Sequence, residues 1–282
     1  MQNTRTKTGS ELAVNVMKYS VMIVSCLIIL LPIIVVFFGS FKTHAEFYDS
    51  NPLSPPASFL NFDNYKAVFV EGKLLTGFIN TAIIMVISLT GSILSGTTIA
   101  YVFSRFQFRG KKILQNMFLF AALVPGVTMQ VTVFQVINQL GAFNTLMAPI
   151  LLYIGTDIMA IYIFMQFIDS ISKDLDEAAL IEGASYFRVF FKIILPLLKP
   201  AIVTIIIISG TTIYNDFYTA FLYMPSADLA TISTSLFNFK GPYASSWEII
   251  LAGIIVVMFP MLIVFLTLQK YIYNGLTAGS VK

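Results

Sequence analysis

Three ionisable side chains lie inside long apolar stretches of the sequence: Asp157, Lys199 and Asp216. If such stretches cross a bilayer, each buried charge costs about 2.5–3.5 kcal/mol on insertion scales, so these side chains are expected to face a cavity or a partner. Lys199 stands near the end of its stretch and can extend its charge to the membrane surface. Asp157 follows Gly155, and it either caps a helix broken at that glycine or lines a pathway.

The segment Tyr214-Asn215-Asp216-Phe217-Tyr218 combines a carboxylate, an amide and two phenols. Such a cluster can hydrogen-bond to hydroxyl groups and stack against sugar rings, but it can equally join two helices. We therefore expect one set of residues along any substrate pathway: Asp157, Tyr214, Asn215, Asp216 and Tyr218. The two carboxylates are few for a carrier that is driven by protons or Na⁺.

The remaining chemistry is sparse. His44 is the one histidine, Cys26 is the one cysteine, and no H-E-x-x-H or C-x-x-C motif is present. The phosphate-binding pattern G-x-x-x-x-G-K-[ST] is also missing. These observations predict no catalytic residues, no metal site and no ATP hydrolysis by this chain alone, so we do not expect an enzyme.

The elements that hold these residues are long and apolar. Of 282 residues, 57% are apolar and 11% are charged, against about 25% charged in a soluble domain. A bilayer core is about 30 Å thick and a helix rises about 1.5 Å per residue, so each of the following stretches is long enough to cross it. The stretches are 19–38, 77–103, 113–137, 146–168, 197–223 and 249–268. They lack the alternation of a membrane β-barrel, which predicts an all-α polytopic membrane protein with six transmembrane helices.

Positive charges indicate the orientation. If both termini are cytoplasmic, most Lys and Arg residues fall on inner segments, which is the asymmetry of the positive-inside rule. The formal charge of +3 then reflects topology, and no nucleic-acid partner is expected. The predicted organisation is a cytoplasmic tail (1–18), one six-helix domain (19–268) and a cytoplasmic tail (269–282). Within the domain, 169–196 is the large inner segment and 224–248 an outer loop, and no second domain is expected.

Two sequence features concern helix packing. Gly91, Ser92, Ser95 and Gly96 place small residues four apart, which lets another helix approach closely. Val124-Pro125-Gly126 interrupts the third stretch and predicts a kink there.

The large inner segment predicts two short helices. Asp174 can serve as N-cap with Glu177 closing a capping box, and Gly183 permits the left-handed conformation that ends a helix. Ser185 can cap a second helix that runs to Pro196, where the next span is expected to begin. The first helix is short and rich in alanine, so it fits a groove on another protein.

This segment resembles a known signature. Glu177-Ala178-Ala179, Gly183 and Leu195-Pro196 match the E-A-A…G…L-P pattern of the membrane-spanning subunits of binding-protein-dependent ABC importers, with Glu182 where the family usually has Asp. The resemblance implies the ABC importer type I permease fold and a cytoplasmic coupling helix docked in a cleft of an ATPase subunit. The residues that it assigns to this helix are Glu177, Ala178, Ala179, Glu182, Gly183 and Ala184.

Further segments resemble the maltose-transporter G-type permeases of carbohydrate importers: Asn215-Asp216-Phe217, residues 236–247 and the ending 275–282, with Tyr214 in place of the usual tryptophan. The resemblance implies that the outer loop reaches into a sugar-binding protein through Asn238, Gly241, Pro242 and Tyr243.

The same resemblance implies the partners. They are the lipid bilayer, a second homologous permease in a heterodimer, two ATPase subunits that bind ATP and Mg²⁺, and an extracytoplasmic sugar-binding protein. The expected location is the bacterial or archaeal cell membrane, and the expected cargo is a di- or oligosaccharide of the multiple-sugar or raffinose type. An importer permease for another solute, such as a polyamine, and an ion-coupled secondary carrier remain as alternatives.

Overall fold

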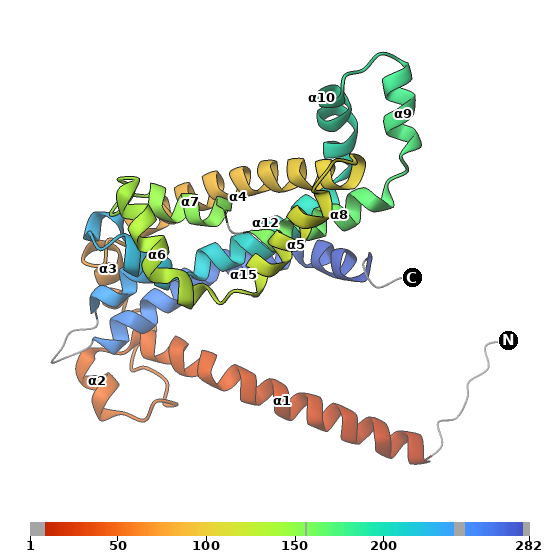
Figure 1. Ribbon diagram of the computed structural model, residues 1–282. Coiled ribbons are helices and arrows are strands. Elements are labelled where there is room, and N and C mark those ends of the chain that lie inside the picture. Colours follow the sequence, from red (N-terminus) through yellow and green to blue (C-terminus); the bar gives the residue numbers. More distant parts are fainter. Residues whose placement is uncertain (1–8, 156, 240–245, 279–282) are drawn as a thin grey trace. The chain divides into compact units, whose positions relative to one another are not determined.

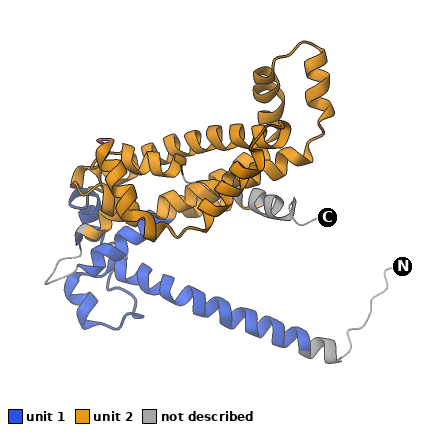
Figure 2. Ribbon diagram, in the orientation of Figure 1, with its two compact units in different colours: residues 1–72, 239–258 blue, residues 73–238, 259–282 orange. Residues whose placement is uncertain are grey.

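The computed structural model describes residues 9–155, 157–239 and 246–278, and within these ranges it contains helices and turns without any strand (Figure 1). The chain divides into two compact units, coloured separately in Figure 2. Unit 1 comprises residues 1–72 and 239–258, and unit 2 comprises residues 73–238 and 259–282. The last helix, α15 (Trp247–Ala278), contributes residues to both units.

Three helices are long and apolar enough to cross a membrane by themselves: α1 (Gly9–Phe41), α4 (Leu74–Arg105) and α15. Three further candidates are bent pairs. They are α5 (Lys111–Leu123) with α6 (Gly126–Gln139), α7 (Met147–Gly155) with α8 (Ile158–Ser170), and the helical stretch Tyr186–Leu197 with α12 (Lys199–Asn215). The protein is therefore a multi-pass membrane protein, and six spans result if each pair forms one span.

The bends follow from the local sequence. Pro125 lacks an N–H, and α5 and α6 meet around it at 105°, which confirms the predicted kink. The prediction of a single helix over 197–223 is wrong. The chain bends by 69° at Leu198, where Pro200 is suited to begin a new helix, and α12 ends at Asn215.

Unit 1 contains α1, α2 (His44–Asp49) and α3 (Asp63–Val70). The most apolar part of α1 has none of its described side chains buried in this chain, so that surface suits lipid or another protein. Beyond α1, the side chain of Lys42 is buried, and its Nζ donates to Ser50 Oγ and Asn51 O at 2.8 Å and to Ser54 Oγ at 3.2 Å. These neutral oxygens satisfy the buried ammonium and fix the turn that follows α2.

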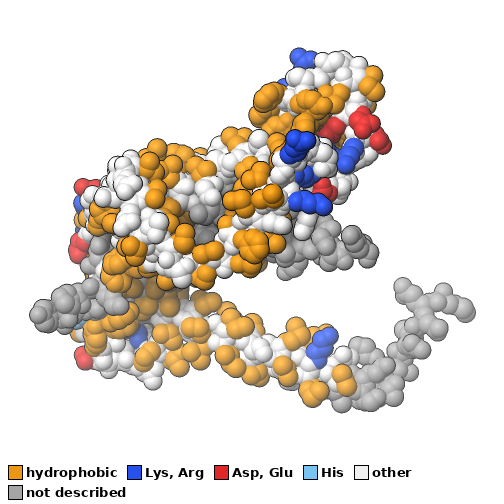
Figure 3. Space-filling view, viewed as in Figure 1, with side chains coloured by type: hydrophobic (Ala, Val, Ile, Leu, Met, Phe, Trp, Pro, Cys, Tyr) orange, Lys and Arg blue, Asp and Glu red, His pale blue; other side chains and the backbone are white. Residues whose placement is uncertain are grey.

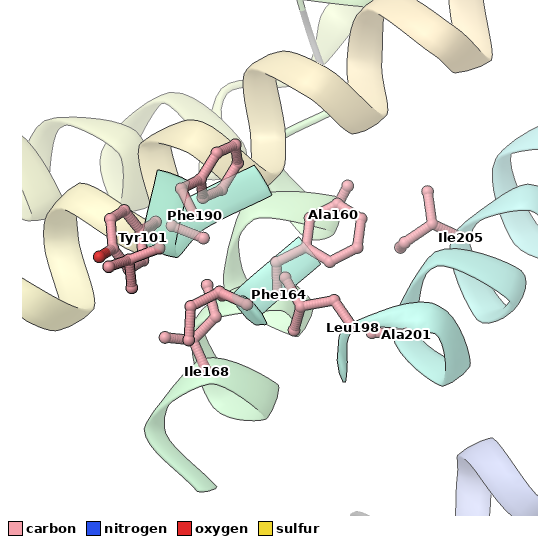
Figure 4. Close-up of a cluster of buried hydrophobic side chains, with 11 residues drawn as sticks. Tyr101, Ala160, Phe164, Ile168, Phe190, Leu198, Ala201 and Ile205 are labelled. Atoms are coloured by element: carbon pink, nitrogen blue, oxygen red, sulfur yellow. The ribbon is translucent and has the colours of Figure 1, made fainter. Parts of the chain in front are cut away.

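Unit 2 is built around α4, which packs along α7 and α8 and also contacts α12. The small residues of α4 admit neighbouring side chains: a Cβ at Gly91 would lie 2.5 Å from Ile154 Cδ1, and one at Gly96 would lie 3.3 Å from the Phe164 ring. The predicted close helix packing is therefore present, although it is side chains that approach these two glycines. The main apolar cluster lies nearby and joins α4, α8 and α12 (Figure 4); its labelled members are Tyr101, Ala160, Phe164, Ile168, Phe190, Leu198, Ala201 and Ile205.

The segment after α12 folds back onto the start of α4. It forms α13 (Tyr218–Tyr223), the 3₁₀ turn Ala227–Leu229, α14 (Ile232–Ser235) and the 3₁₀ turn Leu236–Phe239. Asn80 Nδ2 donates to Asp228 O at 3.0 Å and to Ala230 O at 2.9 Å, and Thr81 Oγ1 accepts from Ile232 N. The first part of the predicted outer loop is thus tied to a membrane helix.

Candidate functional site

A helical hairpin projects from one end of unit 2 (Figure 1). It consists of α9 (Asp174–Ile181) and α10 (Tyr186–Val189), and we call it the α9–α10 hairpin. Gly183 between them has φ +86°, and Ala184 N donates to Ala179 O at 2.9 Å, as in a helix end that closes through a left-handed residue. Ser185 Oγ accepts from Arg188 N at 3.4 Å and caps α10. The predicted two-turn helix, its glycine end and the second cap are confirmed.

The N-terminus of α9 differs from the prediction. Lys173 occupies the N-cap position in right-handed helical conformation and makes no side-chain capping bond, so the capping box of Asp174 and Glu177 is not formed. Because Lys173 extends the helical conformation, Asp174 lies in the first turn, and its N–H donates to Ser172 Oγ at 3.3 Å. The acidic side chains still lie at the positive end of the helix dipole.

The helix α9 has two faces of different character. Ala179, Leu180 and Ala184 are partly buried and pack on the apolar cluster of unit 2. Glu177, Ala178 and Glu182 are exposed. Ala179 and Ala184 contact this chain's own core, so of these three alanines only Ala178 is exposed, and close approach of a partner to it stays a prediction.

Two further side chains of the hairpin are apolar and exposed, one at the end of α9 and one in α10. Ile181 is 88% exposed and Phe187 is 78% exposed. Exposed large apolar side chains that are rimmed by polar residues are typical of a surface that another protein covers. We call Glu177, Ala178, Ile181, Glu182 and Phe187 the outward face of the hairpin. In the view of Figure 3, charged and apolar side chains lie together on and beside the hairpin at the upper right, whereas apolar side chains are spread over the rest of unit 2.

A buried ion pair lies at the base of the hairpin, and the sequence did not predict it. Arg105 Nε donates to Asp176 Oδ2 at 2.8 Å, and the two side chains are 5% and 9% exposed. The Arg105 guanidinium also donates to Ile171 O at 2.9 Å. The pair joins residues 71 positions apart, and neither lies inside a predicted span, so the sequence offered only an acidic helix start and a basic turn as signals.

Asp157 is the N-cap of α8 and contacts three helices. Its Oδ1 accepts from Ala160 N at 3.1 Å, and its Oδ2 accepts from Ser92 Oγ of α4 at 3.1 Å and from Ser209 Oγ of α12 at 2.7 Å. Of the two predicted roles, the capping role is the one that the geometry shows. A carboxylate with three donors can be held inside a membrane protein at acceptable cost.

Asp157→Ala is expected to lower the stability of the purified protein. It removes a helix cap, worth about 1 kcal/mol, and leaves the Ser92 and Ser209 hydroxyls without their acceptor. We expect the apparent unfolding temperature in detergent, followed by size-exclusion after heating, to fall by about 5 °C. Asp169→Ala, at an exposed acid on the same helix, is the matched control. An unchanged unfolding temperature for Asp157→Ala would contradict this role.

Asp216 also acts within the chain. It follows the end of α12, and its carboxylate accepts from Tyr153 Oη of α7 at 2.7 Å and from Thr219 N at 3.0 Å. It therefore joins helices, which is one of the two interpretations that the sequence left open. Tyr214 is buried, whereas Asn215 and Tyr218 remain exposed, and Tyr218 Oη donates to Gln130 Oε1 of α6 at 2.7 Å.

Cavities in unit 2 meet these residues. One, of about 590 Å³, is a depression open to the surface along the end of α12, and its polar lining is Thr211, Thr212, Asn215 and Asp216. Another, of about 740 Å³, lies among α5, α6, α7, α8 and α13, and its polar lining includes Gln130, Tyr153 and Tyr218. A smaller cavity of about 220 Å³ contains Asp157. Gln130 is a lining residue that sequence reasoning missed, since a single glutamine in an apolar stretch carries no pattern.

The predicted binding-protein loop lies mostly outside the described residues. Gly241, Pro242 and Tyr243 fall in the gap between residues 239 and 246. The backbone of Asn238 belongs to the 3₁₀ turn Leu236–Phe239, but its side chain lies outside the described part.

Comparison with solved structures agrees with this fold. A bacterial ABC transporter involved in the import of the acidic polysaccharide alginate contains a chain that matches with a TM-score of 0.84 at 21% identity, covering 95% of this chain and 99% of that chain. A chain of a bacterial alginate ABC transporter in complex with an alginate pentasaccharide-bound periplasmic protein matches with a TM-score of 0.57 at 16% identity, covering 93% of this chain and 97% of that chain. At these identities the likeness establishes the fold.

Curated proteins with similar sequences have higher identities to this chain than these solved structures have. The galactooligosaccharides transport system permease protein GanQ of Bacillus subtilis (strain 168) is 35% identical over 226 residues, covering 78% of this chain and 80% of that protein. The probable starch degradation products transport system permease protein AmyC of Thermoanaerobacterium thermosulfurigenes is 30% identical and covers 95% of this chain and 98% of that protein. Residues 92–277, which include the hairpin and its ion pair, match the family described as binding-protein-dependent transport system inner membrane component. The chain belongs to that family and is a permease subunit of an ABC transporter.

Proposed function

We propose that this chain is one permease subunit of an ATP-driven importer that receives a di- or oligosaccharide from a solute-binding protein. The observation that carries the proposal is the α9–α10 hairpin, which presents an acidic and apolar face at one end of a membrane helix bundle. The relatives support the cargo class, because those named above and the melibiose/raffinose/stachyose import permease protein MelC of Bacillus subtilis (strain 168) are all named for oligosaccharides or starch products.

In this proposal the energy comes from partners. Two ATPase subunits bind ATP and Mg²⁺, and this chain has no ATPase site of its own. The outward face of the hairpin, with Glu177 and Ala178, docks in one ATPase subunit on the cytoplasmic side, where both termini also lie. Closure of the ATPase pair moves the hairpin, and the bundle follows as a rigid body. Nucleotide thereby favours one of two access states through differential contacts.

A second, similar permease is expected to complete the pathway as a heterodimer. On this chain, the side chains suited to touch a sugar are Asn215, Tyr218 and Gln130, which line cavities with amide and phenol groups. Asp157, Asp216 and Tyr214 act indirectly, because their polar atoms or their bulk are used within the chain. On the outer side, Asn238, Gly241, Pro242 and Tyr243 are proposed to contact the sugar-binding protein.

The test is reconstitution. The chain is co-expressed with a second permease, an ATPase and a sugar-binding protein of the same organism, and the complex is placed in liposomes that hold ATP. We expect uptake of raffinose, galacto-oligosaccharides, arabino-oligosaccharides or maltodextrins that requires the binding protein and ATP. Uptake of spermidine in place of every sugar would overturn the cargo class. Ion-driven uptake by this chain alone would overturn the importer assignment.

A further inference from the structure

The C-terminal end of α4 binds the segment of the chain that leads into α9. Arg105 is the last residue of α4, and its guanidinium bonds both the Asp176 carboxylate inside α9 and the backbone carbonyl of Ile171 before it. A planar guanidinium that makes two directed bonds fixes orientation as well as distance. The entry to α9 is therefore attached to α4 at two points.

The same end of α4 also contacts the segment that follows the hairpin turn and leads away from it. The Tyr101 ring lies 5.2 Å from the ring of Phe190, and Phe106, directly after α4, lies 5.1 Å from Tyr186. These centroid distances are those of packed aromatic pairs. Both sides of the hairpin thus contact one short segment, residues 101–106, which is the last turn of α4 and the residue after it.

The ion pair at this point is enclosed. Arg105 Nη1 and Asp176 Oδ1 are buried and have no hydrogen-bond partner among the described residues. A buried pair whose remaining polar atoms are unsatisfied is a poor choice for stability alone, because apolar side chains of similar volume would serve as well. It does provide one fixed geometry between α4 and α9.

Since α4 packs along α7, α8 and α12, movement of its end reaches the helices that line the cavities. We propose that Arg105 is a positioning residue that transmits the movement of the α9–α10 hairpin directly into α4, through Asp176 and Ile171. This inference rests on the proposed function, and it adds a second mechanical link beside the covalent connections of the hairpin to α8 and α12.

The experiment uses the full importer in liposomes and compares three versions of this chain. Arg105→Met with Asp176→Leu removes both charges and keeps apolar bulk. Arg105→Lys keeps both charges of the pair but loses the planar guanidinium fork, and Arg109→Met alters an exposed neighbour as the matched control. The measured quantities are uptake of whichever of raffinose, galacto-oligosaccharide, arabino-oligosaccharide or maltodextrin the native complex transports, and the ATPase rate with and without the loaded binding protein.

For the double variant we expect the stimulation of ATPase by the loaded binding protein, and the uptake, to fall about tenfold, and for Arg105→Lys we expect a smaller fall in the same direction. The unstimulated ATPase rate should stay at its native level, and Ala178→Cys, in a Cys26→Ser chain, should still crosslink to the ATPase subunit. Arg109→Met should match the native chain in every measurement.

Native stimulation and uptake in the double variant would overturn the inference while leaving the proposed function intact. Loss of the crosslink from position 178 would also overturn it, because the pair would then serve to build the docking helix itself. If the native complex shows neither stimulation nor uptake with any of these sugars, the proposed function fails, and the inference fails with it.

Discussion

Gly183→Pro is expected to abolish uptake, by about 100-fold or more, while the chain still inserts in the membrane. Gly183 has φ +86°, and proline is locked near −65°. Proline also removes the bond from Gly183 N to Leu180 O. No side-chain or backbone atom of another part of the described structure lies within 4 Å of a Cβ placed there, so the effect comes from backbone conformation and not from crowding. The turn between α9 and α10 would therefore have to adopt another conformation, and the residues of the outward face would change their positions relative to one another.

The measurement is ATP-dependent uptake in liposomes, together with the amount of permease in the purified complex. Gly183→Asn is the matched control, because asparagine tolerates the left-handed conformation better than other non-glycine residues. We expect Gly183→Asn to retain a large part of native uptake. Native uptake by Gly183→Pro would show that the turn is not needed for coupling.

Glu177→Lys is expected to reduce both uptake and sugar-stimulated ATPase activity by about 100-fold. Glu177 is exposed on the outward face, so the chain itself should fold normally. The substitution removes the carboxylate that is proposed to form charged hydrogen bonds with the ATPase subunit. It also places a positive charge opposite the groups that paired with that carboxylate. We therefore expect the ATPase subunit to dissociate from the membrane complex.

Co-purification of the ATPase subunit with the permease measures this loss. Asp169→Lys makes the same charge change at an exposed residue of α8, outside the hairpin, and should leave association within about twofold of native. A Glu177→Lys complex that retains its ATPase subunit and transports normally is incompatible with docking through this face.

Local signals in the sequence predicted the features that one residue type controls. Pro125 predicted the sharp bend between α5 and α6, and Gly183 and Ser185 predicted the end of α9 and the start of α10. These three predictions are confirmed because the missing N–H of proline, the permitted φ of glycine and the capping hydroxyl of serine each act within a few residues.

Features that depend on distant contacts could not be predicted in this way. The partner of Asp176 is Arg105, and hydropathy does not pair them. Asp216 resembles a pathway residue in the sequence, but Tyr153 of α7 and Thr219 occupy its carboxylate. The fifth apolar stretch appears continuous by composition, yet the chain bends at Leu198 and α12 ends at Asn215, because prolines and side-chain bonds decide where helices begin and end.

The division of α9 into two faces has an evolutionary consequence. Ala179 and Ala184 are constrained by the packing of this chain, whereas Ala178, Ile181 and Phe187 are exposed, and under the proposed docking they can change together with the surface of the ATPase subunit. A chimera that exchanges only the outward positions should therefore accept the motor subunit of a related importer. The membrane portion of such a hybrid would need no compensating mutations.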